Sequence, residues 1–157
     1  MFDGSLVGIF VTARKGAPLR AVDEALAVLG RGIEGDRYAA AEGTFSKPGA
    51  EGREVTLIEV EAIEAVAEES AIALSPADAR RNLMTRGVPL NHLVGVEFSV
   101  GGDVVLRGVK LCEPCAHLEL LTKKGVREAL VHRGGLRAQI VRGGAIRVGD
   151  AIRLVNR

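Results

Sequence analysis

The two cysteines, Cys112 and Cys115, are the residues of this chain with the clearest capacity for chemistry. They are the only cysteines in 157 residues, and they lie three positions apart beside a proline. A thiolate is both a soft metal ligand and a nucleophile. Upstream, Arg80, Arg81 and Asn82 supply guanidinium and amide groups that suit an anionic, polar ligand. This combination indicates a cysteine that holds a metal or carries sulfur beside a basic pocket.

Four interpretations of the cysteine pair are open. Both thiols could be packed as small apolar groups, since free cysteine is often buried. They could form a redox pair, although the strand–helix–strand pattern that usually accompanies one is missing here. They could bind zinc together with His117 and His132, since zinc takes four such ligands. A single reactive or metal-holding thiolate, with the second cysteine in support, is the interpretation that the sequence favours.

Positive charge near Cys115 would favour its thiolate, because a free thiol has a pKa of about 8.5. His117, two residues further on, could lower that pKa or relay a proton. If residues 80–82 form a strand, the side chains of Arg80 and Asn82 share one face and Arg81 takes the other. Further arginines that could join this pocket are Arg53, Arg86, Arg133 and Arg137. For Asp36 and Arg37, pairing within their own loop is favoured over lining a pocket.

Composition sets the class of protein. We expect one domain over residues 1–157, long enough to bury a core that is poor in aromatic side chains. The net charge of +1 argues against nucleic acid or a membrane surface as partner. No apolar run approaches the roughly 20 residues that span a bilayer. The first residues lack the pattern of a signal peptide, so we expect a cytoplasmic protein.

Apolar alternation and glycine punctuation predict a mainly β chain with inserted helices. Expected strands cover residues 5–13, 26–29, 53–58, 136–141 and 145–155, with a hairpin over 96–106. An amphipathic helix is expected over 59–70, a second over 124–132, and a helical turn at 90–94. Residues 30–37 read as a shaped loop and 42–52 as a surface loop. The tight glycine corners near the C-terminal end are typical of a small closed barrel.

Six sequence blocks, in this order, resemble the MOSC domain, which is named for the C-terminal part of molybdenum-cofactor sulfurase. They are the runs at residues 32–37, 53–58, 80–91, 111–115, 133–138 and 144–150. The resemblance implies a closed β-barrel like that of the pyruvate-kinase barrel domain, and a site for the molybdenum cofactor, a molybdenum–molybdopterin. Pyridoxal phosphate has no visible site in the chain.

The resemblance also implies roles for individual residues. Cys115 corresponds to the thiolate ligand of molybdenum or to the proposed sulfur carrier, with His117 beside it as a second catalytic candidate. Arg80 and Asn82 look like the family's contacts to pterin and phosphate. Further residues expected at the cofactor are Arg53, Arg81, Thr85 and Cys112.

Related MOSC enzymes reduce N-hydroxylated compounds with electrons from a separate flavin or iron–sulfur protein. We therefore expect a small-molecule substrate and an external electron-transfer protein. The alternative is a sulfur carrier that receives persulfide sulfur from a donor and passes it to a cofactor or metal centre. A module that stores or delivers the cofactor is a third possibility.

Overall fold

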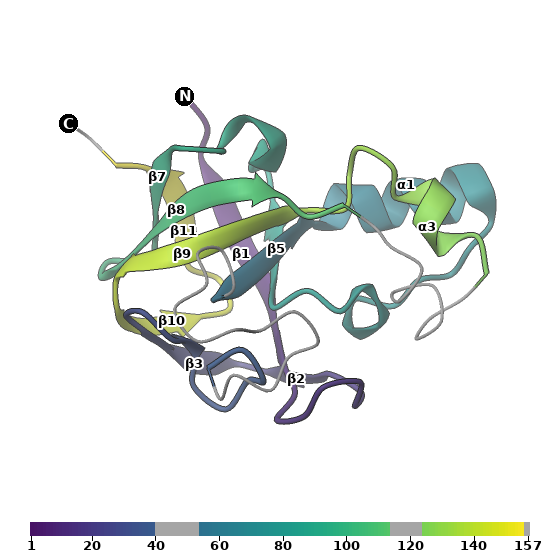
Figure 1. The fold of residues 1–157 in the computed structure, drawn as a ribbon. Helices are drawn as coiled ribbons and strands as arrows, with labels where there is room; N and C mark the ends of the chain where they lie inside the picture. The colour runs from purple at the N-terminus through teal and green to yellow at the C-terminus, as the bar shows by residue number, and fades with distance from the viewer. Residues whose placement is uncertain (40–53, 114–123, 156–157) are drawn as a thin grey trace.

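A closed ring of seven strands forms the body of the protein. The computed structural model describes residues 1–39, 54–113 and 124–155. Hydrogen-bonded neighbours follow the order β1, β6, β5, β9, β8, β7, β11, and β11 pairs again with β1 to close the barrel (Figure 1). The expectation of a mainly β, closed-barrel fold is confirmed. The strands of the ring are β1 (Gly4–Val11), β5 (Val55–Glu59), β6 (Leu83–Arg86), β7 (Glu97–Val100), β8 (Val104–Leu111), β9 (Leu136–Arg142) and β11 (Ala151–Leu154).

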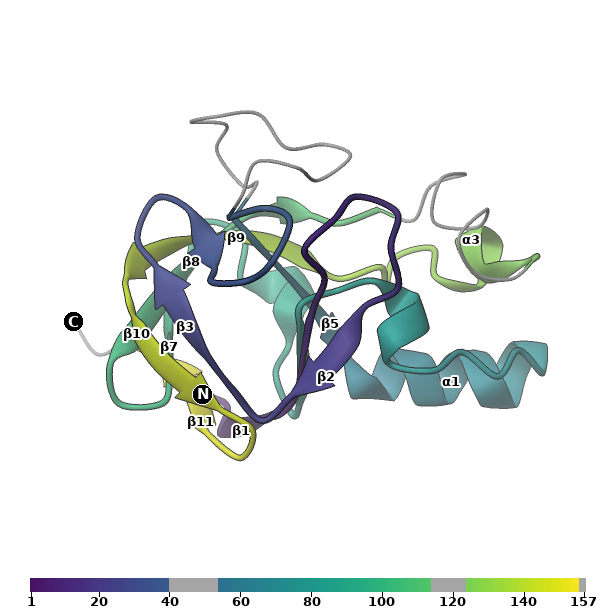
Figure 2. The ribbon, with the colours of Figure 1, turned by 90° about the horizontal axis from the view of Figure 1, so that it is seen from below.

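One pair in the ring is parallel. Strands β5 and β6 run in the same direction, and the helix α1 (Val60–Ser70) lies in the connection between them. The helix buries Ala62, Ile63 and Val66 and leaves its glutamates toward solvent, as the amphipathic pattern predicts. Figure 2 shows α1 outside the barrel, on the side of β5. Within the described residues, no helix is long and apolar enough to cross a membrane.

A small second sheet lies at the end of the barrel away from the N-terminus (Figure 1). It contains β10 (Gly144–Arg147), β3 (Glu24–Val28) and β4 (Gly32–Ile33) in that order. The short strand β2 (Arg20–Val22) pairs with the last three residues of β1 and leads into β3. At this end β1 pairs with β6 along one edge and with β2 along the other.

Two apolar clusters hold the fold together. The first fills the barrel and includes Leu6, Leu57, Leu83, Phe98 and Leu136. The second lies between the outer wall of the barrel and the helices. It joins Ile58 and Met84 to the buried residues of α1 and to Val126 and Leu130, at and beside α3 (Val126–Ala129). Successive residues of β5 and β6 therefore serve different clusters, as strand alternation requires.

Most of the predicted elements are present, with three differences. The hairpin of β7 and β8, the helix α1 and the helical turn η2 (Leu90–His92) match their predictions. The predicted helix over 124–132 is shorter, covering only α3. Strands β2 and β4 were not predicted, because each has only two or three residues and little apolar alternation.

The predicted strand geometry for residues 80–82 is wrong. The short 3-10 helix η1 (Ala77–Ala79) ends at Arg80, which has a left-handed backbone with φ of 58°. Strand β6 begins only at Leu83. Arg80 and Asn82 therefore do not share a face by strand alternation, and their side chains contact different parts of the chain.

Candidate functional site

Three buried arginines gather at the end of the barrel where β1 meets β2. Arg37, Arg80 and Arg81 are only 4%, 9% and 8% exposed. Arginine is rarely buried without a partner, because removing its charge from water is costly. Among the described residues, Asp36 is the one carboxylate paired with any of them. The cluster thus carries more positive than negative charge, as an anion-binding site requires.

Asp36 fixes the position of Arg37. Its Oδ1 accepts from Arg37 Nη1 at 3.1 Å and from the backbone N–H of Thr12 at 3.1 Å. Its Oδ2 accepts from the backbone N–H of Tyr38 at 3.2 Å. Asp36 is only 1% exposed, and its carboxylate accepts hydrogen bonds from three donors. Its side chain is therefore held in one orientation. The expected pairing of Asp36 with Arg37 within their loop is confirmed.

Arg37 in turn connects this loop to the basic motif. Its Nη2 donates to the hydroxyl of Tyr38 at 3.3 Å and to the carbonyl oxygen of Arg80 at 3.4 Å. The guanidinium also lies over the Tyr38 ring, 4.3 Å from the ring centre. An arginine held by a carboxylate, a ring and a backbone carbonyl has little freedom to reorient, so its charge is preorganised.

Arg80 uses its unusual backbone conformation to reach a different loop. Its Nη1 donates to the carbonyl oxygen of Ala17 at 2.9 Å. The side chain borders a cavity of about 150 Å³, lined also by Leu19 and Asp78. Burial lowers the pKa of Arg80, and the neighbouring charge of Arg37 lowers it further. Since arginine stays protonated in proteins, this shift reflects the cost of burying the Arg80 charge beside Arg37, a cost that a bound anion would reduce.

Arg81 links the cluster to the base of the cysteine segment. Its Nε donates to the carbonyl oxygen of Gly134 at 2.8 Å. The carbonyl oxygen of the next residue, Gly135, accepts from the backbone N–H of Cys112 at 2.7 Å. Both ends of the predicted site are therefore attached to the same two-residue segment. Cys112 itself is a free cysteine and only 2% exposed, so its side chain is packed at this junction.

Asn82 holds strands together. It is fully buried, and its Oδ1 accepts from both the backbone N–H and the hydroxyl of Thr56, at 3.1 and 3.2 Å. Its Nδ2 donates to the carbonyl oxygen of Phe10 at 3.2 Å. These bonds join β5 to β1 directly before β6 begins. The described contacts of Asn82 thus position Arg81 and Arg80, while a direct contact with a cofactor stays a prediction.

Thr85 lies in a different environment. It is fully buried two residues after Leu83, on the face of β6 that points into the barrel. Its hydroxyl has no hydrogen-bond partner among the described residues. The hydroxyl therefore lies among apolar side chains, and its predicted contact with a cofactor has no counterpart in the described cluster of arginines.

Two other predicted arginines, Arg86 and Arg133, form ion pairs outside the cluster. Cys115, His117 and Arg53 lie outside the described residues. Arg86 is half exposed and pairs with Glu64 on the helix. Arg133 pairs with Glu69. In the described ranges, no three residues of the metal-ligating types come together.

Sequence reasoning did not assign a functional role to residues 36–38. Their signal was present in the shaped loop that ends with Gly35, Asp36, Arg37 and Tyr38. When an acid, an arginine and an aromatic residue follow one another after a glycine, the carboxylate and the ring can hold the guanidinium group in place. That assembly becomes visible only once the fold brings Arg80 beside it.

Comparison with known proteins places this arrangement in a family. The family model for the MOSC domain matches residues 45–153. The chain belongs to the MOSC domain family. This match includes the basic motif and both cysteines, whereas the Asp36–Arg37 loop precedes it. A comparison with curated proteins gave no match.

Solved structures similar to this MOSC protein support the fold. The YuaD protein of Bacillus subtilis has a TM-score of 0.79 at 16% identity, with 97% of each chain covered. YiiM from Geobacillus stearothermophilus has a TM-score of 0.72 at 15% identity, covering 98% of this chain and 76% of the other. YiiM from Escherichia coli has a TM-score of 0.67 at 18% identity, covering 98% and 70%. At these identities the similarity establishes the fold alone.

Proposed function

We propose that this MOSC protein binds a molybdenum–pterin cofactor and reduces N-hydroxylated compounds with electrons from a separate protein. The observation that carries the proposal is the cluster of Arg37, Arg80 and Arg81, three buried cations with one described carboxylate among them. Such a cluster fits the anionic phosphate of a pterin cofactor, because guanidinium groups match phosphate oxygens in shape and charge.

The donor chemistry of the described residues agrees with this cofactor. The Nε of Arg81 donates to the carbonyl of Gly134, and within the described ranges neither of its Nη groups has a partner. One Nη of Arg80 likewise donates to the carbonyl of Ala17. No described residue occupies the remaining donors of these two guanidinium groups, and we propose that they bind phosphate oxygens. Each hydrogen bond to such a charged group contributes roughly 1.5–3 kcal/mol.

Each residue has a distinct task in the proposed activity. Arg80 and Arg81 bind the anionic end of the cofactor, and Asp36 keeps Arg37 in place behind them. By resemblance, the thiolate of Cys115 is the protein ligand of molybdenum, and His117 can hold or release a proton beside it. When bound, the cofactor supplies a redox-active metal with affinity for oxygen. In the overall reaction, two electrons and two protons convert the N–OH group to N–H and water.

The metal and pterin content of the purified protein tests this proposal. The full chain is expressed in a host that makes the cofactor, and molybdenum and pterin are measured per chain. We expect both near one equivalent, and we expect Cys115→Ser to lose molybdenum while the protein remains folded. Metal-free wild type carrying labile sulfur on Cys115 would replace the proposal with the sulfur-carrier function. Stoichiometric zinc would overturn both.

Turnover is tested separately. Loaded protein is given an N-hydroxylated amidine and an artificial one-electron donor, and formation of the amidine is followed. The proposal expects multiple turnovers per molybdenum. A fully loaded protein without turnover would instead indicate storage or delivery of the cofactor.

A further inference from the structure

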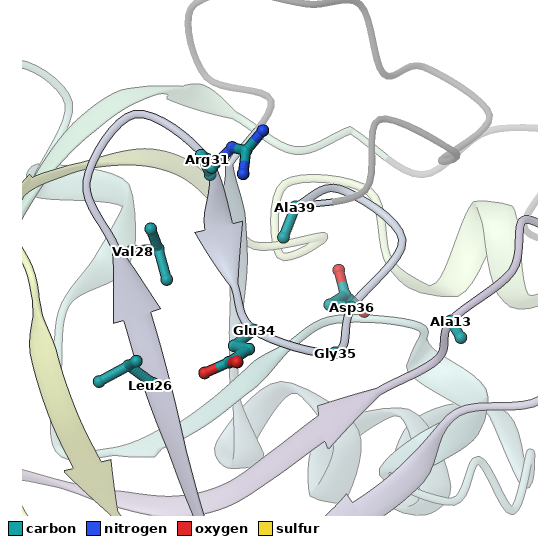
Figure 3. Close-up of a pocket in the computed structure, with 8 residues that line it drawn as sticks. All are labelled: Ala13, Leu26, Val28, Arg31, Glu34, Gly35, Asp36 and Ala39. Carbon is teal, nitrogen blue, oxygen red and sulfur yellow. The ribbon is translucent and has the colours of Figure 1, made fainter.

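A second cavity lies beside the arginine cluster and shares Asp36 with it. The cavity has a volume of about 410 Å³ and is lined by residues of β3, of the turn between β3 and β4, of the loop after β4 and of the segment that follows β1 (Figure 3). This volume falls within the range of about 300–1,000 Å³ that is typical of small-molecule sites. The lining residues are Ala13, Leu26, Val28, Arg31, Glu34, Gly35, Asp36 and Ala39.

The wall formed by β3 is apolar and accessible. Leu26 is 43% exposed, and Val28 follows it on the same face of the strand. Figure 3 shows both side chains on one side of the cavity. Since exposed leucine at the mouth of a cavity gains from contact with a ligand, this wall suits an apolar group.

The charges of the cavity differ in their availability. Asp36 is already bound by Arg37 and two backbone N–H groups, so it has little capacity for a ligand. Glu34 is exposed, and its carboxylate has no ion pair or hydrogen bond among the described residues. In Figure 3 this carboxylate is directed toward Leu26, at the apolar wall.

The one cation of the lining lies elsewhere. Arg31 is exposed, and Figure 3 shows its guanidinium at the far end of the cavity from Glu34, pointing away from the carboxylate. A ligand that packs against Leu26 therefore lies closer to the carboxylate of Glu34 than to the guanidinium of Arg31. A carboxylate beside an apolar wall recognises a cation attached to an apolar body.

We propose that this cavity binds an organic cation, with Glu34 pairing its charged head and Leu26 and Val28 contacting its apolar body. The inference rests on the proposed function in one respect, namely that the cavity would be the substrate site beside the cofactor. It narrows the substrate to N-hydroxylated compounds that carry a separate cationic group at neutral pH, because N-hydroxylation itself makes a nitrogen a weaker base. Glu34 would then set specificity by excluding acids of the same shape.

Binding of benzamidine to the full-length protein tests this inference without any need for turnover. Benzamidine is a cation with a flat apolar ring, benzoate is its anionic counterpart, and benzamide is a neutral one. Dissociation constants are measured by titration calorimetry. We expect one benzamidine per chain, with benzamide weaker and benzoate weakest.

Three variants at exposed positions locate the site. Glu34→Gln keeps the shape of the side chain and removes its charge, and should weaken benzamidine about tenfold, as expected for the loss of a charge-assisted hydrogen bond. Arg31→Gln removes the other charge of the same cavity, and should leave benzamidine binding unchanged or tighter. Leu26→Ser should weaken benzamidine and benzamide alike.

The outcomes separate this inference from the cofactor proposal. Tighter binding of benzoate, a larger loss in Arg31→Gln than in Glu34→Gln, or no binding of benzamidine would overturn the organic-cation site. Protein that lacks molybdenum but binds benzamidine through Glu34 would support the cation site and overturn the proposed cofactor. Protein that is loaded with cofactor and turns over, but does not prefer benzamidine to benzoate, would support the proposed cofactor and overturn the cation site.

Discussion

Arg81 and Gly134 are joined by a hydrogen bond of 2.8 Å from the guanidinium Nε to the carbonyl oxygen. The neighbouring carbonyl of Gly135 receives the backbone N–H of Cys112 at 2.7 Å. The basic motif and the start of the cysteine segment are thus attached to one short stretch of backbone. A substitution of Gly134 or Gly135 should therefore alter the positions of both Arg81 and Cys112.

Gly135→Ala should destabilise the protein strongly. Gly135 has φ of 109°, and a Cβ there would lie 2.0 Å from the carbonyl oxygen of Leu57. Gly95→Ala is the matched control, because Gly95 has φ of 77° but open space around it. We expect a loss of more than about 3 kcal/mol for Gly135→Ala and about 1 kcal/mol for the control in urea unfolding. Equal losses would mean that the close approach to Leu57 is unimportant.

Asp36→Asn should cost much more stability than the loss of an exposed carboxylate. It leaves Arg37 buried beside two other arginines without its counter-charge, and breaking a buried pair in this way costs about 3–5 kcal/mol. Glu64→Gln removes the exposed partner of Arg86 and should cost less than about 0.5 kcal/mol. Thermal unfolding of both variants measures the difference. A mild effect of Asp36→Asn would show that the cluster tolerates an additional unpaired charge.

Asn82→Ala tests whether Asn82 acts mainly through the fold. The substitution leaves the backbone N–H and hydroxyl of Thr56 and the carbonyl of Phe10 without their partner, so we expect a loss of about 3 kcal/mol. Asn91→Ala is the control, since the exposed Asn91 has one side-chain bond among the described residues, to the carbonyl of His132, and its loss should cost about 0.5 kcal/mol. Unchanged stability of Asn82→Ala, with loss of cofactor, would assign Asn82 to the cofactor instead.

Thr85→Val should be neutral or stabilising by about 1 kcal/mol, because it replaces a buried hydroxyl that lacks a described partner with a methyl group of similar size. Thr56→Val removes a hydroxyl that bonds to Asn82 and should destabilise. Unfolding free energies and molybdenum content are measured on both. Destabilisation together with loss of molybdenum in Thr85→Val would give Thr85 the cofactor role predicted from sequence.

Glu59→Gln should change how stability depends on pH. Burial raises the pKa of the half-buried Glu59, the charge of Glu61 raises it further, and His92 opposes both. The folded-state pKa therefore lies above the ordinary value of 4.5. The ionised carboxylate costs stability above the folded pKa, and this cost fades as the pH falls through it toward the ordinary value.

The variant should accordingly be more stable than wild type at neutral pH, by less than about 1 kcal/mol because the group is half exposed. The difference should vanish near about pH 4, where the wild-type carboxyl is protonated in both states. Glu68→Gln on the exposed face of the same helix should give no such profile. Stability measured at several pH values decides, and a gain that persists in acid would contradict the assignment to Glu59.

The sequence predicted the barrel well because its long strands alternate strongly. The β7–β8 hairpin and α1 carry clear periods of two and 3.6 residues, and the glycines mark the turns between them. It failed at residues 80–82, where Arg80 takes a left-handed backbone at the end of η1 and its side chain bonds to the Ala17 carbonyl 63 positions away. No local pattern contains that contact.

The candidate site was predictable in its residue types and less so in their roles. Arg80 and Arg81 were predicted to supply a basic pocket, but on opposite faces of a strand, whereas both are buried without strand geometry and Asn82 bonds to the backbone and to Thr56. Arg37 was placed in its own loop, and its position behind Arg80 follows only from tertiary structure. Cys115, His117 and Arg53 stay predictions.

The molybdenum content of Arg81→Met, compared with Arg86→Met, tests the central claim most directly. Both substitutions remove one arginine, but Arg81 is buried in the cluster and Arg86 is half exposed beside the helix. Circular dichroism and unfolding curves first establish that both variants are folded. The account predicts wild-type molybdenum in Arg86→Met and a large loss in Arg81→Met. A folded Arg81→Met that keeps one molybdenum per chain would contradict it.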